Sequence, residues 1–368
     1  MNFIKILPFV LVFLCYSCTQ KEVMPEYITT IELKESKDFL PLSSFISDLN
    51  YLELQVTEAN IELGEIRDIK ILDNDLIIKH RKAGEISFIR FSKEGKFLNE
   101  LINNSTREIS GLLDIISYKN GYAVLGENGI HFISKEGRYN GKLVSSEIDG
   151  SNFFAAKNRF YTVNESNAND FLIEYSENGA PKKVNALNER FDKLIYTNIA
   201  SVGKNNYHLL SSFSDVVYCY SAGKLLPKYK LNGGIYPTLK EVWQNVGDRD
   251  IKETMRYIYD TQHVLLKNYL ENDDIIFMTY WVGSSSTTAI IKKENWETRY
   301  YGRGINDIDG GIWDKVLCLS TNNELYIPIS AAKITGHKII NKWNKDFEDI
   351  QTHIAATGNP MIMCCKLK

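Results

Sequence analysis

A recurring turn constrains the fold of this chain more than any other feature of its sequence. Short polar turns that end in glycine separate pairs of apolar stretches at intervals of 42, 42 and 44 residues, at Gly95, Gly137, Gly179 and Gly223. A fifth copy has Asn295 at the corresponding place, and asparagine is the residue after glycine that best accepts a left-handed turn position. A period of about 40 residues indicates a supersecondary unit repeated along the chain.

A second set of turns alternates strictly with the first. Each has an asparagine between two apolar stretches, at Asn74, Asn120, Asn158, Asn205, Asn272 and Asn322. Two hairpins per repeat give four strands in about 40 residues, which is typical of a blade of a β-propeller. An aromatic content of 12% with only 8 prolines also favours strands.

Six asparagine turns and five glycine turns leave the sixth blade incomplete. Met361–Cys365 is an apolar stretch at one end of the chain, and Tyr51–Val56 alternates with the period of a strand near the other end. Pairing strands from both ends in one blade would remove the free edges of the ring. We therefore predict an all-β fold over residues 28–368, a six-bladed β-propeller of four-stranded antiparallel blades closed by N- and C-terminal strands.

Two stretches lengthen the repeat and space their apolar residues as a helix does. We expect short helical insertions at about 238–262, where Thr238 to Glu241 form a capping box, and at about 338–356. Packing of the apolar helix faces against the propeller is the expected role. A lid or a partner surface is the alternative.

The first residues have the pattern of an export signal. Lys5 precedes a run of nine apolar residues, Ile6–Leu14, which is too short to cross a bilayer, and Ser17–Cys18 follow. A small residue before cysteine resembles a lipobox, so we predict a lipoprotein signal peptide at 1–17, lipid attachment at Cys18 and a tether at 18–27. An ordinary secretory signal cut near residue 20 is the alternative. The expected location is the cell envelope, anchored to the outer membrane, on either its periplasmic or its surface side.

Charge and cysteine content exclude several classes of protein. The chain has 43 Lys and Arg against 46 Asp and Glu, so no excess of positive charge is present for a generally basic nucleic-acid binder. Beyond Cys18 the cysteines have no C-x-x-C spacing. Neither a zinc knuckle nor a disulfide framework is indicated.

Several longer segments together resemble the six-bladed β-propeller lipoproteins of Bacteroidota, which are distantly akin to NHL-repeat propellers. The matching pieces are PLSSFISDLNYLELQV at 41–56, the stretch 63–98 that includes the first SKEG turn, NDIDGGIWDKVLCLSTNNELYIPISA at 306–331, and GNPMIMCCKLK at 358–368. The loop INNSTREISGLL at 102–113 departs from the Gly-Pro-rich loop that is usual there. The resemblance implies the fold and the compartment. It implies no established activity.

No catalytic residue is predicted. The six histidines are scattered along the chain, and neither a G-x-S-x-G elbow nor a phosphate-binding loop occurs. Ligand-binding candidates come from one loop and its neighbours in the repeat: Asp307, Asp309, Trp313 and Trp281. The two tryptophans either stack on sugar rings or fill the interfaces between blades.

The acidic loop 306–311 has two interpretations. Asp307 and Asp309 precede paired glycines, as at the start of a calcium loop, but Cys318 stands where an EF-hand requires glutamate. The loop either contributes ligands to a central ion or forms a tight turn between blades, in which Asp accepts hydrogen bonds from backbone amides. No cofactor is expected, with calcium as the one candidate.

Two functions are consistent with these observations. The first is a lipid-anchored binding or scaffolding module of the cell envelope that presents a loop face to a glycan, a peptide or an envelope protein, and not to nucleic acid. The alternative is a calcium- or zinc-dependent enzyme of the lactonase or lyase type, with Asp307 and Asp309 near the central channel. The absence of a catalytic motif favours the first, without deciding whether the protein is an enzyme.

Overall fold

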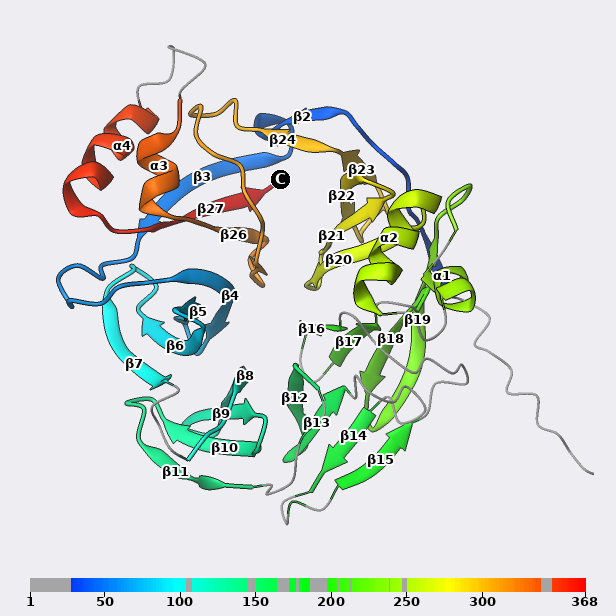
Figure 1. Ribbon diagram of the computed structural model, residues 1–368, viewed down its shortest axis with the longest axis horizontal. Helices are drawn as coiled ribbons and strands as arrows, with labels where there is room; N and C mark the ends of the chain where they lie inside the picture. Colours follow the sequence, from blue (N-terminus) through cyan, green and yellow to red (C-terminus); the bar gives the residue numbers. More distant parts are fainter. Residues whose placement is uncertain are drawn as a thin grey trace, which may run out of the picture.

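A computed structural model describes residues 28–103, 108–143, 148, 150–163, 172–176, 179, 181–185, 197–203, 206–211, 214–237, 239–246, 250–338 and 346–368 of the chain. In these ranges the chain forms six four-stranded antiparallel sheets arranged as a ring (Figure 1). This confirms the predicted six-bladed propeller. The predicted signal peptide, Cys18 and the tether lie outside the described residues.

Five blades are built from consecutive strands. The first blade consists of β4 (Glu65–Leu72), β5 (Asp75–Lys82), β6 (Glu85–Phe91) and β7 (Phe97–Asn103), and the second of β8 (Leu112–Tyr118), β9 (Gly121–Gly126), β10 (Gly129–Ser134) and β11 (Tyr139–Lys142). The third consists of β12 (Phe153–Ala156), β13 (Arg159–Val163), β14 (Leu172–Tyr175) and β15 (Pro181–Asn185), and the fourth of β16 (Thr197–Val202), β17 (Asn206–Ser211), β18 (Val216–Ser221) and β19 (Lys224–Asn232). The fifth consists of β20 (Val264–Glu271), β21 (Ile275–Val282), β22 (Ser285–Lys292) and β23 (Thr298–Tyr301).

Both ends of the chain contribute to the sixth blade. Its order is β25 (Cys318–Leu319), β26 (Glu324–Ile329), β27 (Met361–Leu367) and β3 (Ile46–Glu53). The C-terminal strand β27 pairs antiparallel with β3, which confirms the predicted closure. The N-terminal strand begins at Ile46, before the predicted start at Tyr51, and ends at Glu53.

The four predicted turn glycines are left-handed, whereas among the asparagine turns this holds at Asn74 and Asn158, and the neighbouring Lys119 and Asn323 are left-handed in place of Asn120 and Asn322. Gly95 and Gly137 both have φ of 81°, and Asn74 has φ of 69°. In the fifth copy the left-handed residue is Trp296, with φ of 59°, and not the predicted Asn295. Asn295 instead accepts a hydrogen bond from the backbone N–H of Glu297 (2.9 Å), so it stabilises the turn through its side chain.

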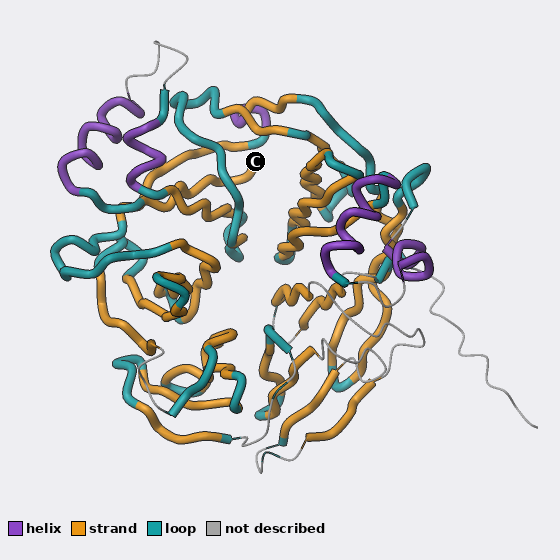
Figure 2. Tube along the Cα trace, viewed as in Figure 1, coloured by secondary structure: helices purple, strands orange, loops and turns teal. Residues whose placement is uncertain are grey.

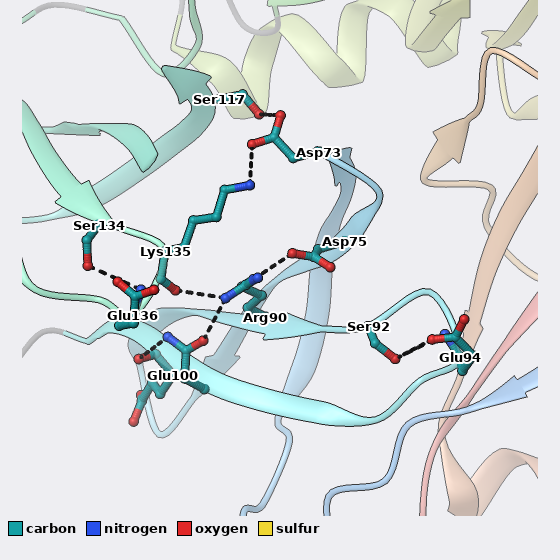
Figure 3. Close-up of polar contacts among 11 residues, drawn as sticks. Asp73, Asp75, Arg90, Ser92, Glu94, Glu100, Ser117, Ser134, Lys135 and Glu136 are labelled. Carbon is teal, nitrogen blue, oxygen red and sulfur yellow. Dashed lines mark hydrogen bonds and ion pairs between the residues drawn. The ribbon is translucent and has the colours of Figure 1, made fainter. Parts of the chain in front are cut away.

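The repeated turns also connect neighbouring blades (Figure 3). Arg90 of the first blade donates from Nε to Asp75 Oδ2 (2.7 Å) and from Nη1 to the carbonyl oxygen of Lys135 (3.1 Å), in the SKEG turn of the second blade. In return, Lys135 Nζ lies 2.9 Å from Asp73 Oδ2. A polar turn of one repeat therefore binds the turns of the next.

The N-terminal segment forms a strap outside the ring that the sequence did not predict. Strand β1 (Thr29–Glu32) adds a parallel fifth strand to β19, and β2 (Phe39–Pro41) pairs parallel with β24 (Arg303–Ile305). Between them, the buried Tyr280 hydroxyl accepts from the backbone N–H of Lys34 (3.0 Å) and donates to its carbonyl oxygen (2.7 Å). The strap leads through η1 (Leu42–Ser44) into β3.

Helices lie at the rim of the ring (Figure 2). α1 (Leu239–Val246) and α2 (Ile251–Thr261) precede β20, while α3 (Ala331–Gly336) and α4 (Asp346–Thr357) separate β26 from β27. Both predicted insertions contain helix, although residues 339–345 of the second lie outside the described ranges and α3 was not predicted. No helix within the described residues combines the length and apolarity that crossing a bilayer requires.

The strand order gives the ring two unlike faces. In the five blades built from consecutive strands, the turn between the first two strands and the turn between the last two lie on one face, together with the turn between β25 and β26 of the sixth blade. This face carries the short asparagine and glycine turns. The opposite face carries the connections with α1 and α2 and with α3 and α4, and the segments 54–64 and 302–317. We call these the short-turn face and the long-loop face. A rigid scaffold with long loops on one side is the usual arrangement of a binding face.

Candidate functional site

A cleft on the long-loop face contains both predicted tryptophans. It has a volume of about 480 Å³ and lies between the fifth blade and the segment that enters the sixth. Trp281 comes from β21, and Trp313 comes from the loop before β25. We call this hollow the tryptophan cleft. Its charged lining is Lys267, Arg303, Asp314 and Lys315, and its aromatic lining is Phe277, Trp281, Tyr301 and Trp313.

Each indole packs against the protein on one side and lines the cleft on another. The ring of Trp281 lies 5.2 Å from that of Tyr259 on α2, and Trp313 contacts Phe45 edge-on at 5.9 Å. Both indoles are half-buried. Each indole therefore fills space between elements of the protein and also presents part of its surface to solvent.

Glycine at position 304 makes room for one of these rings. A Cβ atom built on Gly304 would lie 2.7 Å from Cδ1 of Trp313, well inside a normal contact. Strand β24 can therefore pass directly against the indole only because residue 304 has no side chain. The position of Trp313 depends on this close approach.

Short hydroxyl side chains form another wall of the cleft. Thr279 and Thr288 are direct cross-strand partners on β21 and β22, with hydroxyl oxygens 3.4 Å apart, and Ser286 pairs with Trp281. A hydroxyl both donates and accepts hydrogen bonds. The Asn268 side chain donates to the carbonyl oxygen of Val316 (3.0 Å) and so fixes the loop that carries Trp313.

Positive charge predominates in the cleft. The Lys267 ammonium lies 3.8 Å from the centre of the Trp281 ring, and Arg303 and Lys315 are exposed. The one carboxylate of the lining, Asp314, forms an ion pair with Lys333.

A larger groove adjoins the cleft. It has a volume of about 990 Å³, lies between the sixth and first blades, and shares Asp314 and Lys315 with the tryptophan cleft. Its charges are mostly paired: Arg67 Nη2 lies 2.7 Å from Glu65 Oε2, and Lys82 Nζ lies 2.7 Å from Glu62 Oε2. We call it the adjoining groove.

The two predicted aspartates do not line the cleft. Asp307 accepts hydrogen bonds from the backbone N–H (2.9 Å) and the hydroxyl (2.5 Å) of Ser43, in η1. Although burial acts in the opposite direction, these bonds hold the pKa of Asp307 below its usual value. Asp307 thus fastens the strap to the loop 306–311.

Asp309 is buried and accepts from the backbone N–H of Gly311 (2.8 Å) within its own turn. Burial, and then the nearby Asp309 carboxylate, raise the pKa of Tyr51 well above its usual value. Both aspartates therefore have protein partners. The described residues contain no group of three or more His, Cys, Asp or Glu side chains placed to hold a metal ion.

Both predicted tryptophans line the cleft, but the side chains around them were not predicted. Lys267, Arg303 and Lys315 stand in no motif. Lys267 is the extra residue of a β-bulge, because Leu266 pairs with Tyr280 and Asn268 pairs with the adjacent Thr279. No pattern in the sequence marks such a bulge, so the position of Lys267 in the cleft lining is known only from the structure.

Comparison with known proteins supports the fold. No model of a known protein family matches this sequence, and no curated protein is significantly similar to it. Among solved structures, a protein described as exported from Bacteroides fragilis superposes with a TM-score of 0.74 at 14% identity, covering 92% of this chain and all of that one. A member of the DUF4221 family from Bacteroides vulgatus superposes with a TM-score of 0.52 at 8% identity, covering 88% of this chain and 97% of that one. At these identities the likeness concerns the fold alone.

Proposed function

We propose that this protein is an exported, lipid-anchored binding module that holds a glycan in the tryptophan cleft. The observation that carries the proposal is the composition of the cleft: two half-buried indoles beside a wall of hydroxyl and amide side chains, on the long-loop face. A pocket with a few convergent polar groups among apolar ones is the usual form of a small-ligand site.

Sugar chemistry matches these walls. A pyranose ring has an apolar face of C–H groups, which suits an indole, and a rim of hydroxyls that both donate and accept hydrogen bonds. The side chains of Thr279, Thr288 and Ser286 also do both. Binding to a largely preformed site loses little conformational freedom, because the walls belong to paired strands.

The anchoring part of the proposal depends on the N-terminus. A run of nine apolar residues ends three residues before Ser17–Cys18, and the similar structure from Bacteroides fragilis is described as exported. Changing Cys18 to Ala should move the protein from the outer-membrane fraction to the soluble fraction of cells that express it. Unchanged sedimentation with the membranes would contradict lipid attachment at Cys18.

Thermal melts of the full chain in detergent, with neutral oligosaccharides, acidic oligosaccharides and peptides, test glycan binding. A ligand present at about 100 times its Kd adds about 2.7 kcal/mol to the free energy of unfolding, which for a chain of this size is a rise in Tm of a few degrees. We expect a shift with at least one oligosaccharide class and none with peptides. Shifts with peptides alone, or with no member of the panel, would contradict a glycan ligand and direct the search to a partner protein.

Variants locate the site. Trp281→Ala and Ser286→Ala should each reduce the ligand-induced shift. Trp296→Ala is the matched control because Trp296 is 40% exposed and lies in a turn of the short-turn face. Equal loss of the shift in all three variants would contradict binding at the tryptophan cleft.

A further inference from the structure

We propose that the glycan is acidic, an extended chain of sugars bearing carboxylate or sulfate groups, which runs from the tryptophan cleft across Lys315 into the adjoining groove. This inference rests on the proposed function and specifies its ligand. It is carried by the placement of cations along the two hollows.

The cleft has three cationic side chains, Lys267, Arg303 and Lys315, and one carboxylate, Asp314. Asp314 is engaged with Lys333. Within the described part of the chain, neither Arg303 nor Lys315 has a carboxylate within ion-pair distance, and both are exposed. A cleft with this excess of positive charge favours an anionic ligand over a neutral one of the same shape.

Two of the cations owe their position to the same backbone feature. Lys267 is the extra residue of the bulge in β20, and Arg67 is the extra residue of a bulge in β4, where Ile66 pairs with His80 and Asp68 with Lys79. Both strands are the first of their blades. A bulge interrupts the alternation of side chains and redirects one of them, and here the redirected residues line the cleft and the groove respectively.

Lys315 lies between these two positions. It precedes β25, the first strand of the sixth blade, and it lines both hollows. Basic side chains therefore occur at the entry to the first strand of three consecutive blades, in the order Lys267, Lys315, Arg67. Because the two hollows share this wall, a ligand with regularly spaced negative groups can contact all three.

An acidic peptide would also be attracted to this charge, but the rest of the cleft favours a sugar. The uncharged polar lining consists of hydroxyl and amide side chains, including Thr279, Ser286 and Thr288, beside two indoles. These groups match the hydroxyls and the C–H face of a pyranose. An acidic peptide is one of the outcomes that the experiment separates.

Isothermal titration of the full chain in detergent tests the inference with five probes. They are a hexamer of galacturonate, the same hexamer with its carboxylates reduced to alcohols, the galacturonate dimer, a heparin-derived hexasaccharide and hexaglutamate. The carboxylated and reduced hexamers differ only at C6, where an anionic carboxylate is replaced by a neutral hydroxymethyl group. The heparin fragment separates sulfate from carboxylate, and the dimer tests the length of the site.

We expect at least one acidic hexasaccharide to bind about tenfold or more tightly than the reduced hexamer, since a hydrogen bond to a charged group contributes more than one to a neutral group. That binding should weaken as salt is raised. The double variant Arg303→Gln/Lys315→Gln should weaken it about tenfold or more. The matched control Lys93→Gln/Lys224→Gln, which removes two exposed cations of the short-turn face, should not. The dimer should bind more weakly than the hexamer and be insensitive to Arg67→Gln.

Three results would overturn the inference in distinguishable ways. Equal binding of the acidic and the reduced hexamers would contradict a preference for acidic glycans but would still agree with the proposed glycan-binding function. Binding of hexaglutamate without any hexasaccharide would replace the glycan by an acidic peptide and overturn both. Binding of no probe would also contradict both.

Discussion

Met363 pairs directly with Tyr51 across two antiparallel strands, although the two residues lie near opposite ends of the chain. The pairing completes the sixth blade, so the ring is closed by hydrogen bonds between chain ends. The sixth blade thus takes its outer strand, β3, from the N-terminal part of the chain and the adjacent strand, β27, from the C-terminal end. The sixth blade therefore depends on the pairing of β3 with β27.

The first prediction concerns this closure. Ile362 on β27 is fully buried and packs with Leu54 and Phe91 between the sixth and first blades. Ile362→Ala should lower the free energy of unfolding by about 2–5 kcal/mol, as expected when a buried aliphatic side chain leaves a cavity. Leu226→Ala, at a side chain 50% exposed in β19, is the control and should cost little. Urea unfolding measures both, and similar losses would contradict a closed core.

The second prediction concerns the repeated glycine turn. Gly95 has φ of 81°, and a Cβ atom there would lie 2.0 Å from the carbonyl oxygen of Glu53. Gly223 has φ of 89° but nothing within 4 Å of the same position. Gly223→Ala should cost about 1–2 kcal/mol for the left-handed conformation, and Gly95→Ala distinctly more, because it also displaces the end of β3. Equal losses in urea unfolding would show that the contact with Glu53 is unimportant.

The third prediction concerns a buried charged group between the fourth and fifth blades. The Glu271 side chain is fully buried and contacts His208 Nδ1 (2.5 Å), the Tyr229 hydroxyl (2.9 Å) and Lys293 Nζ (2.6 Å). Glu271→Gln would leave buried cations without their counter-charge, which costs about 3–5 kcal/mol. Glu294→Gln, at an exposed position nearby, is the control. A loss below 1 kcal/mol for Glu271→Gln, by urea unfolding, would contradict the pairing.

The fourth prediction is the pH dependence of the same pair. Burial lowers the pKa of His208, but its hydrogen bonds to Cys219 and Glu271 outweigh burial, so the net shift is upward. A raised pKa stabilises the folded chain fully below the unfolded value of about 6.5, and that stabilisation is lost as pH rises through the folded pKa. Burial raises the pKa of Glu271, but His208 and Lys293 outweigh burial and lower it. The stabilisation of the folded chain by ionised Glu271 is therefore lost only as pH falls below about 4.

Comparison of the native chain with His208→Gln at pH 5.5 and pH 8.5 measures this effect. The native chain should exceed the variant in unfolding free energy by more at pH 5.5 than at pH 8.5. A difference that does not change with pH would show that folding leaves the pKa of His208 unshifted, and a smaller difference at pH 5.5 would show that folding lowers it; either result would contradict this prediction.

The fifth prediction concerns calcium. Asp307 and Asp309 already accept hydrogen bonds from Ser43 and Gly311, so we expect Tm to be the same with calcium and with a chelator. Asp307→Ala should lower stability by about 0.5–2 kcal/mol, as for loss of a capping carboxylate, by releasing the strap. A calcium-dependent rise in Tm that Asp307→Ala abolishes would instead support an ion site in this loop.

The repeated turns and the closure of the ring could be predicted from the sequence, and features without a sequence motif could not. Gly95 and Gly137 recur at the blade period, and the apolar stretch at Met361 needed a partner, so the ring and its closure followed. The strap pairs β1 and β2 with distant strands and has no repeat of its own. The bulge at Lys267 recurs in the first strands of two other blades, at Arg67 and Leu113, but one extra residue in a strand leaves no motif in the sequence.

The candidate site was half predictable for a related reason. Trp281 and Trp313 are conspicuous residues near one loop, and both line the cleft. Asp307 and Asp309 have the composition of a calcium loop and also that of a turn with capping carboxylates, because both uses need carboxylates beside glycines. The position of Ser43 beside Asp307 depends on the strap, which no local pattern reveals.

Hydrogen–deuterium exchange with and without the hexasaccharide that binds most tightly tests whether a glycan binds on the long-loop face at the tryptophan cleft. We expect slower exchange in peptides covering residues 276–288 and 302–317, with no change in the turns around Gly95, Gly137 and Gly223. Protection confined to the short-turn face, or no protection at saturating ligand, would contradict it.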